Sequence, residues 1–464
     1  MNFIGVEFLY FFLIVFVLYW VFPNRRWQNV LLFAASLVFY GWLAAWHALV
    51  LLASIAVDYF LALAMPRWKT RSSLLMWLGI ILNIGLIASV KYYLNFDDAL
   101  AEWSLQTGFG QGFLLSTILL PLGVSFFTLK KIAYLVDVNR SAMPPVKDFI
   151  AFGAYVSFFP QVFSGPIDRP QAFLKQLEEP RTWAMDHIYN AWQLIVMGLF
   201  KKIVIANTVK VIVDQIFLMR EPSKIFLIVG GLGFTLQILA DFSSYTDLSR
   251  GIAFLLGLKT SENFNKPYIS QTPNDFWNRW HMSFSFWLRD YIFFPVRRAL
   301  MRASWLPAVF SQIVPPLITM FISGVWHGTG NTFIVWGLYY GVLIVTYQLL
   351  GVKVGQTPTK RFFAWLVMFM LIAFGWVIFR APSTAWLWNA LRLSPFASGP
   401  EEWFASLTLT VMIAFYASLL FIKYILDEYF PKITWLHALY YAAALILTFV
   451  FMNSSTPDFI YFQF

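Results

Sequence analysis

Apolar residues come in long runs along this chain, and short polar loops separate the runs. A run of roughly 17–25 residues is long enough for an α-helix to cross a bilayer, and continuously apolar runs lack the alternation of barrel strands. The pattern predicts an all-α polytopic membrane protein with about eleven transmembrane helices. The clearest runs lie near residues 1–22, 30–46, 48–65, 74–94, 317–326, 332–350, 362–379, 405–426 and 434–452.

Three further apolar stretches carry polar or helix-breaking residues. The stretch 114–136 is interrupted by a Pro-Leu-Gly turn and by a pair of lysines. Residues 150–166 are broken by Pro160 and end in a Gly/Pro-rich segment, so we expect a re-entrant segment that lines protein or a cavity. Residues 187–216 mix apolar positions with lysines, which predicts an interfacial amphipathic helix or a helix at the cytoplasmic edge.

Composition supports the membrane assignment and limits the partners. Charged residues make up 12% of the chain, whereas soluble proteins contain about 25%. The net charge of +10 could indicate nucleic acid, but basic residues gather in short loops beside apolar runs, as at 67–71 and 353–361. The positive-inside rule and lipid headgroups account for this placement, so we expect a bilayer and no nucleic acid as partner. The absence of cysteine excludes a disulfide, a thiolate metal site and a thioester on the protein.

Charges in the first loops predict the orientation. Arg25, Arg26 and the basic loop 67–71 should be cytoplasmic, and the acidic loop with Asp97, Asp98 and Glu102 should lie on the other side. The N-terminus is then outside. The first run has neither a basic leader nor a small-residue cleavage site, so we expect an uncleaved helix. Since no linker, low-complexity tract or internal repeat is evident, residues 1–464 are predicted to form a single membrane domain.

His327 follows an apolar run and is the first candidate for chemistry. An ionisable residue at bilayer depth is costly and is usually retained for function. Imidazole accepts a proton near neutral pH, which suits a general base. The alternative is an imidazole that bonds a carbonyl at a helix end, with Gly328 and Gly330 terminating the helix. We favour the functional interpretation because His327 lies in apolar surroundings, where burial is costly, and no carboxylate is close in sequence.

His281 lies in a segment too rich in charge to cross lipid comfortably, residues 274–302. If residues 274–294 are helical, Asp275 can meet Arg279 and Trp277 can meet His281, because each pair is four residues apart. A solvated face with a salt bridge explains the pattern equally well. The two histidines could also bind a metal, but no third ligand stands at a recognisable spacing, so no metal is expected.

A polar stretch at 241–247 separates the apolar segments 225–239 and 252–258. We interpret it as a loop whose carboxylates either orient a substrate hydroxyl or cap a helix beginning near Thr246, with capping the simpler explanation. No Gly-x-Ser-x-Gly elbow, Walker loop or dinucleotide fingerprint occurs, which argues against a serine hydrolase and a nucleotide-binding protein.

Motifs dispersed along nearly the whole chain resemble those of membrane-bound O-acyltransferases, in the bacterial branch that contains alginate O-acetylation and teichoic-acid D-alanylation proteins. Some motifs are closer to the acetylation type and others to the D-alanylation type. The matching segments are 164–169 (SGPIDR), 198–202 (GLFKK), 241–247 (DFSSYTD), 262–268 (ENFNKPY), 276–281 (FWNRWH), 326–328 (WHG) and 459–464 (FIYFQF).

The resemblance implies a funnel-like helical bundle with a central pore, in which His327 corresponds to the catalytic histidine of the family and His281 to its second histidine. His327 would take the proton of a hydroxyl that attacks the acyl carbonyl. His281, or a nearby donor such as Asn278, would stabilise the oxyanion. The supporting residues are Asp275, Arg279, Trp280 and Trp326.

The main hypothesis is therefore transfer of an acyl group, expected to be acetyl, from a cytoplasmic thioester to a hydroxyl of an envelope polysaccharide or a relay protein. The co-substrate would be acetyl-CoA or an acyl carrier protein, with no bound cofactor. By the resemblance, the protein would sit in the bacterial cytoplasmic membrane and work with an extracytoplasmic SGNH or esterase-like partner. Two alternatives stay open: D-alanyl transfer to teichoic acid from a carrier-protein thioester, and a transporter without covalent chemistry.

Overall fold

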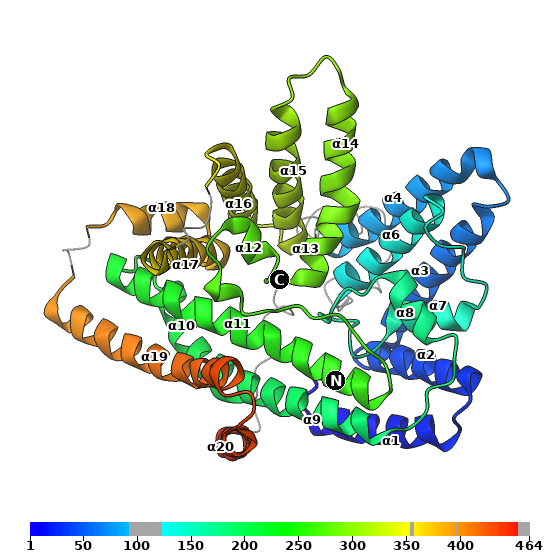
Figure 1. Ribbon diagram of the computed structural model, residues 1–464, viewed down its shortest axis with the longest axis horizontal. Coiled ribbons are helices and arrows are strands. Elements are labelled where there is room, and N and C mark those ends of the chain that lie inside the picture. Colours follow the sequence, from blue (N-terminus) through cyan, green and yellow to red (C-terminus); the bar gives the residue numbers. More distant parts are fainter. Residues whose placement is uncertain (92–122, 353–356, 395–397, 453–464) are drawn as a thin grey trace, which may run out of the picture. The chain divides into compact units, whose positions relative to one another are not determined.

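The computed structural model describes residues 1–91, 123–352, 357–394 and 398–452, and helices are the main regular structure of these residues (Figure 1). The one extended pairing within them is an isolated antiparallel bridge between Phe264 and Trp280. Some sequence features fall wholly or partly outside the described residues: the end of the run 74–94, the acidic loop at 97–102, the first part of the run 114–136, the start of the basic loop 353–361 and the terminal 459–464 motif.

Seven helices among the described residues are long and apolar enough to cross a membrane, which confirms the prediction of an all-α polytopic fold. The number eleven stays a prediction. The spans are α3 (Ala45–Ala64), η1 with α4 (Lys69–Lys91), α11 (Lys224–Leu255), α16 (Asn331–Leu349), α17 (Pro358–Arg380), α19 (Pro400–Tyr429) and α20 (Thr434–Phe451).

The chain divides into two compact units, and the first comprises Met1–Ala191 and Ile252–Ser261. Within it α4 packs on α6, α2 packs on α7, and α3 contacts α2, α4, α6 and α7. The prediction of a single domain over 1–464 stays a prediction. Besides α3 and α4, this unit contains α1 (Val6–Val21), α2 (Arg25–Gly41), α6 (Val124–Asn139), α7 (Phe149–Ser157) and α8 (Pro170–Gln176).

The pair of lysines expected to interrupt the run 114–136 does not break α6. Lys131 Nζ lies 3.1 Å from Asp58 Oδ2 on α3, and Lys130 Nζ donates to Gln161 Oε1 at 2.6 Å. Because each buried ammonium has a polar partner, the helix continues through both positions. The break predicted at Pro160 is confirmed, since α7 ends at Ser157 and the buried segment after it forms turns.

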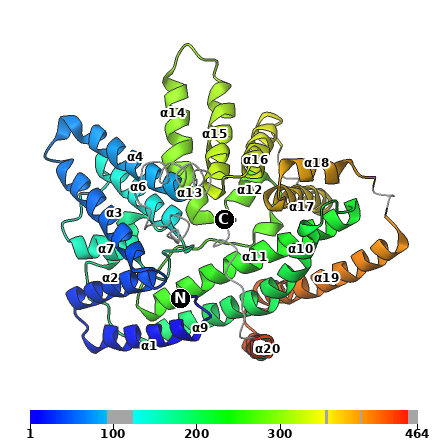
Figure 2. The same cartoon turned by 180° about the vertical axis from the view of Figure 1, so that it is seen from behind.

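The second unit comprises Trp192–Gly251 and Glu262–Phe464. In Figures 1 and 2, α14 and α15 run side by side, and α15 packs closely on α16. Besides the helices named above, this unit contains the end of α9 (Met185–Phe200), then η3 (Lys201–Ala206), α10 (Asn207–Leu218), α12 (Pro273–Trp277), α13 (Met282–Leu288), η5 (Arg289–Phe293), α14 (Phe294–Arg302), α15 (Phe310–His327) and α18 (Thr384–Arg392).

Two glycines allow α15 and α16 to approach each other closely. A Cβ atom added at Gly324 would lie 2.3 Å from the carbonyl oxygen of Phe333, and one at Gly337 would lie 2.3 Å from the carbonyl oxygen of Met320. A side chain at either position would therefore push the helices apart. The close approach places the last turn of α15, which carries His327, against α16.

The prediction of a loop at 241–247 is wrong, because this stretch lies inside the 32-residue helix α11. Lys202 Nζ binds Asp241 Oδ1 at 2.6 Å, and Lys201 Nζ binds Asp247 Oδ2 at 2.6 Å. Both lysines come from η3, a π-helix, and both are buried. Because the lysines neutralise the two carboxylates, these residues can be buried within a continuous helix. The stretch 187–216 is helical, as predicted, and its position at the membrane edge stays a prediction.

The segment 274–302 is not one helix. Thr272 caps α12 by accepting a hydrogen bond from the Asp275 amide at 3.2 Å, and α12 ends at Trp277. The predicted pair is confirmed, with Arg279 Nε donating to Asp275 Oδ1 at 2.7 Å. Trp277 and His281 do not share a helix, and Trp277 instead packs on Tyr340, with ring centroids 5.1 Å apart.

Candidate active site

His327 lies at the C-terminal end of α15 and is only 6% exposed. Aromatic rings surround its imidazole. Its ring centroid lies 4.9 Å from Trp326, 5.1 Å from Trp336 on α16 and 5.3 Å from Phe379 on α17. Three helices thus hold this histidine in an enclosure with little water, where electrostatic interactions with a reacting group are strong.

His281 occupies the turn between α12 and α13, outside the span-length helices, and is 1% exposed. Its backbone is left-handed, with φ 42° and ψ 51°. Its ring packs edge-on against Phe242 of α11, with centroids 4.6 Å apart, and lies 5.0 Å from Phe284 of α13. Burial lowers the pKa of His281 to about 3, so its imidazole is neutral at physiological pH.

A stacked pair of rings, Phe284 and Trp326, brings the two histidines into one cluster. The centroids of this pair are 4.3 Å apart. The ring of His327 lies 5.9 Å from Phe284, and that of His281 lies 6.3 Å from Trp326. Both histidines therefore contact both members of the pair, although 46 positions separate them in the chain. We refer to His281, Phe284, Trp326 and His327 as the histidine–aromatic cluster.

The predicted supporting residues divide into those that reach the cluster and those that do not. Trp326 belongs to it. Trp280 is buried next to His281 and packs on Trp376, with centroids 4.7 Å apart. Arg279 and Asp275 are half-buried and bind each other, while the side chain of Asn278 is exposed.

The sequence did not reveal two buried polar side chains close to His327. Ser323 stands one helical turn before His327 on α15 and is fully buried. Within the described part of the chain, its hydroxyl has no hydrogen-bond partner, and neither does the indole N–H of Trp336. Buried polar groups are usually paired, so these two groups are available to a polar substrate. The four-residue spacing of Ser323 and His327 was the only signal in the sequence.

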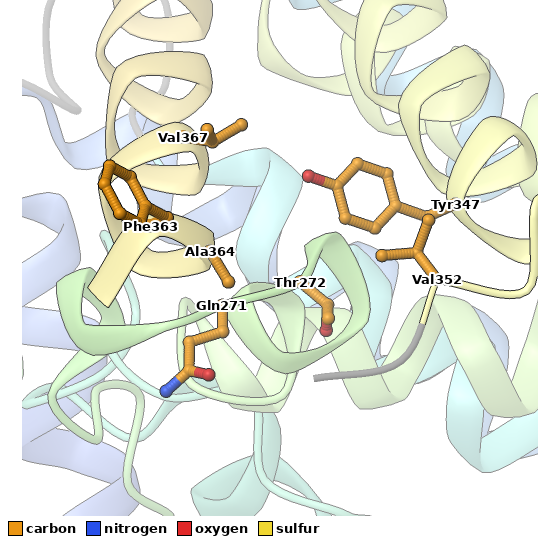
Figure 3. A pocket seen from close by; sticks show the side chains of 7 residues that line it. All are labelled: Gln271, Thr272, Tyr347, Val352, Phe363, Ala364 and Val367. Carbon is orange, nitrogen blue, oxygen red and sulfur yellow. The ribbon is translucent and has the colours of Figure 1, made fainter. Parts of the chain in front are cut away.

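A separate cavity of about 230 Å³ lies between the end of α16, the start of α17 and the loop that precedes α12 (Figure 3). The hydroxyl of Tyr347 points toward the α17 side chains in that view. Neither histidine lines this cavity. In the described ranges, no three His, Cys, Asp or Glu side chains are grouped to hold a metal ion. The lining residues are Gln271, Thr272, Tyr347, Val352, Phe363, Ala364 and Val367.

Comparison with known proteins places this arrangement in a family. Residues 139–388 match the model of the membrane-bound O-acyltransferase family, a range that contains both histidines. The chain is 35% identical over 400 residues to a probable alginate O-acetylase AlgI of Pseudomonas aeruginosa, covering 84% of this chain and 74% of that protein. It is 30% identical over 391 residues to a peptidoglycan O-acetyltransferase of Helicobacter pylori, covering 77% and 72%.

A relative with a different acyl group also matches. The chain is 32% identical over 275 residues to a teichoic acid D-alanyltransferase of Bacillus subtilis, covering 56% of this chain and 68% of that protein. The family resemblance inferred from the motifs is thus confirmed. The chain belongs to the membrane-bound O-acyltransferase family and is a multi-pass membrane acyltransferase.

Proposed function

We propose that this protein transfers an acetyl group from a cytoplasmic thioester to a hydroxyl of an envelope polysaccharide. Two observations on relatives support the acetyl group. The matches to the alginate O-acetylase of P. aeruginosa and to the peptidoglycan O-acetyltransferase of H. pylori span 84% and 77% of the chain, against 56% for the D-alanyltransferase of B. subtilis. A hydroxyl-bearing polymer is the acceptor class that the names of these relatives share.

The observation that carries the mechanism is the histidine–aromatic cluster, which holds two buried imidazoles against one ring pair. His327 accepts the proton of the acceptor hydroxyl as its oxygen attacks the thioester carbonyl carbon. The C–O bond forms, the tetrahedral intermediate collapses, and the C–S bond breaks. The proton on His327 then passes to the departing thiolate, so the histidine returns to its neutral form.

The negative charge on the carbonyl oxygen needs donors in the same enclosure. His281 is the first candidate, because it is neutral and one of its ring nitrogens then carries a proton. The hydroxyl of Ser323 and the indole N–H of Trp336 are further candidates, since both are buried close to His327. The exposed side chain of Asn278 makes it a less suitable donor than His281. Asp275, Arg279 and Trp280 support the turn that carries His281.

The remaining components follow from the reaction and from the loop charges. The donor is acetyl-CoA or an acyl carrier protein, which approaches from the cytoplasm. An extracytoplasmic esterase-like protein completes delivery to the polymer. The protein resides in the bacterial cytoplasmic membrane. Its N-terminus is outside, because the positive-inside rule assigns its first basic loops to the cytoplasmic side.

D-alanyl transfer to teichoic acid is the second candidate function, since the D-alanyltransferase of B. subtilis is 32% identical over 275 residues. Mass spectrometry of envelope polymers separates the two candidates. Cells carrying the intact protein are compared with cells carrying His327→Ala, with equal membrane levels of both proteins. Acetyl esters that depend on His327 support the proposal, and alanyl esters that depend on His327 support the alternative.

A transporter without covalent chemistry makes a different prediction. Purified protein in vesicles is supplied with acetyl-CoA and a hydroxyl-bearing oligosaccharide, and free CoA and the ester product are measured. A transferase consumes the thioester and forms the ester, and His327→Ala does neither. An intact thioester with wild-type protein, together with no difference in envelope esters, would contradict the proposed function.

A further inference from the structure

The first turn of α13 is capped in an unusual way. A helix begins with backbone N–H groups that lack partners within the helix, and a Ser, Thr, Asp or Asn at the N-cap usually binds one of them. The N-cap of α13 is His281, and its side chain makes no capping hydrogen bond. The first N–H groups of α13 must therefore bind another part of the chain.

Asn263, which is distant in the sequence, supplies the acceptors for the first two N–H groups of α13, those of Met282 and Ser283. Its backbone carbonyl accepts from the Met282 amide at 2.9 Å. Its side-chain oxygen Oδ1 accepts from the Ser283 amide at 3.3 Å and from the Ser283 hydroxyl at 2.6 Å. Asn263 is fully buried, so water does not compete for these contacts. Asn263 thus caps α13 in place of His281.

The same asparagine is tied to α11. Its side-chain Nδ2 donates to the hydroxyl of Thr246 at 3.4 Å, and Thr246 lies one turn after Phe242, which packs on His281. Next to Asn263, the bridge between Phe264 and Trp280 fixes the chain on the other side of the turn. Asn263 therefore links its own segment, 263–265, to the two helices that contact His281, namely α11 and the start of α13.

We propose that Asn263 is a positioning residue that holds His281 in its left-handed turn and directs the imidazole toward the histidine–aromatic cluster. A left-handed backbone is unfavourable for a non-glycine residue, so the surrounding structure must hold His281 in this conformation. By binding Met282 and Ser283, Asn263 stabilises the turn and relieves His281 of the capping role. The proposal rests on the proposed function, in which His281 assists acyl transfer.

The alternative is that Asn263 only joins two segments and contributes to stability. The two roles differ in how a change at Asn263 combines with a change at His281. If Asn263 acts through His281, its loss has no further effect on catalysis once the imidazole is absent. If Asn263 is merely structural, the two losses of activity multiply.

The test is a double-mutant cycle with Asn263→Ala, His281→Ala and the double variant, measured as kcat and KM for acetyl transfer. We expect Asn263→Ala to lower kcat by about 10- to 100-fold with little change in KM, because displacing a catalytic group by 1 Å can cost about 100-fold. The double variant should match His281→Ala within about two-fold. Losses that multiply would overturn the proposal.

Asn265→Ala is the matched control. Asn265 is two residues further along the same segment, its side chain is exposed, and it pairs with Arg279 through its backbone amide. This variant should keep wild-type kcat. If Asn263→Ala does not fold, Ser283→Ala replaces it in the cycle, since it removes a single hydroxyl and leaves both backbone amides bound. If the losses of kcat in Ser283→Ala and His281→Ala multiply in the double variant, the proposal is likewise overturned.

Hydrogen–deuterium exchange gives a readout that does not need activity. Exchange at the Ser283 amide, whose acceptor is the Asn263 side chain, should be slow in the intact protein and in Asn265→Ala, and clearly faster in Asn263→Ala. Unchanged exchange in Asn263→Ala would refute the cap itself. If the intact protein transfers no acyl group, the proposed function fails and the positioning role fails with it, and the exchange result then shows whether the cap alone is correct.

Discussion

Phe284 stacks on Trp326, with ring centroids 4.3 Å apart and an interplanar angle of 29°. This pair joins α13 to α15 and lies against the imidazoles of both His281 and His327. Stacked aromatic rings contribute about 0.5–1.5 kcal/mol beyond the area they bury, so the pair also fixes the spacing of the two helices. The relative position of the two histidines therefore depends on an apolar contact.

Replacing Phe284 should disturb both stability and catalysis. Phe284→Ala is expected to lower the free energy of unfolding by about 3–5 kcal/mol, because it leaves a cavity in a packed region. Phe284→Leu fills most of the space and should cost less, yet it removes the stacking surface and should still lower kcat. Thermal unfolding and acetyl-transfer assays on both variants check this. Wild-type kcat in Phe284→Leu would show that the stack is not needed to place the histidines.

Substitutions at His281 should differ in stability according to how readily the new residue adopts a left-handed backbone. Asn adopts this conformation more readily than most residues, whereas a β-branched residue does so rarely. We therefore expect His281→Asn to keep the fold and His281→Val to lose about 1–3 kcal/mol of stability relative to it. Unfolding in detergent or lipid measures the difference. Equal stability of the two variants would mean that the turn relaxes at little cost.

Burial of His281 should make stability depend on pH. Its native pKa is lowered to about 3, while the unfolded value is near 6.5. Below pH 6.5 the unfolded state binds a proton that the native state does not, so stability is complete above pH 6.5 and decreases as pH falls toward 3. Between pH 7.5 and 5 the loss from this group is about 2 kcal/mol.

His281→Asn is the control for this pH effect, because it removes the titrating group and retains a residue suited to the turn. The stability of the intact protein should fall more steeply than that of the variant over this pH range. Parallel stability curves would show that His281 does not stay neutral in the folded protein.

The buried pair of Lys202 and Asp241 should respond more strongly to the loss of one partner than to the loss of both. Lys202→Met removes the ammonium bound to the buried carboxylate of Asp241 and should cost about 3–5 kcal/mol, whereas Lys202→Met combined with Asp241→Leu should recover much of that loss. The control is Lys423→Met, which removes the partner of an exposed carboxylate, Asp427, and should cost at most about 1 kcal/mol. Thermal unfolding of the three variants and the intact protein provides the comparison, and equal costs for Lys202→Met and Lys423→Met would contradict it.

The sequence by itself determined the features that depend on local physics. A continuously apolar run must be helical in a bilayer because every backbone polar group has to bond within the segment, and this identified the span-length helices near 48–65, 332–350 and 434–452. The pair of Asp275 and Arg279 followed from four-residue spacing alone. The cost of burying an ionisable side chain singled out His327, and the structure places it in an aromatic enclosure.

The tertiary structure decided whatever depends on partners distant in the chain. Residues 241–247 have the composition of a loop, and they stay helical because Lys201 and Lys202, about 40 positions earlier, neutralise their carboxylates. Trp277 and His281 do not share a helix, contrary to the assumption behind their predicted contact, because α12 ends at Trp277 and the chain turns before α13 begins. The joining of the two histidines by Phe284 and the cap supplied by Asn263 have no signature in spacing or composition, since both arise when packed helices bring separate segments together.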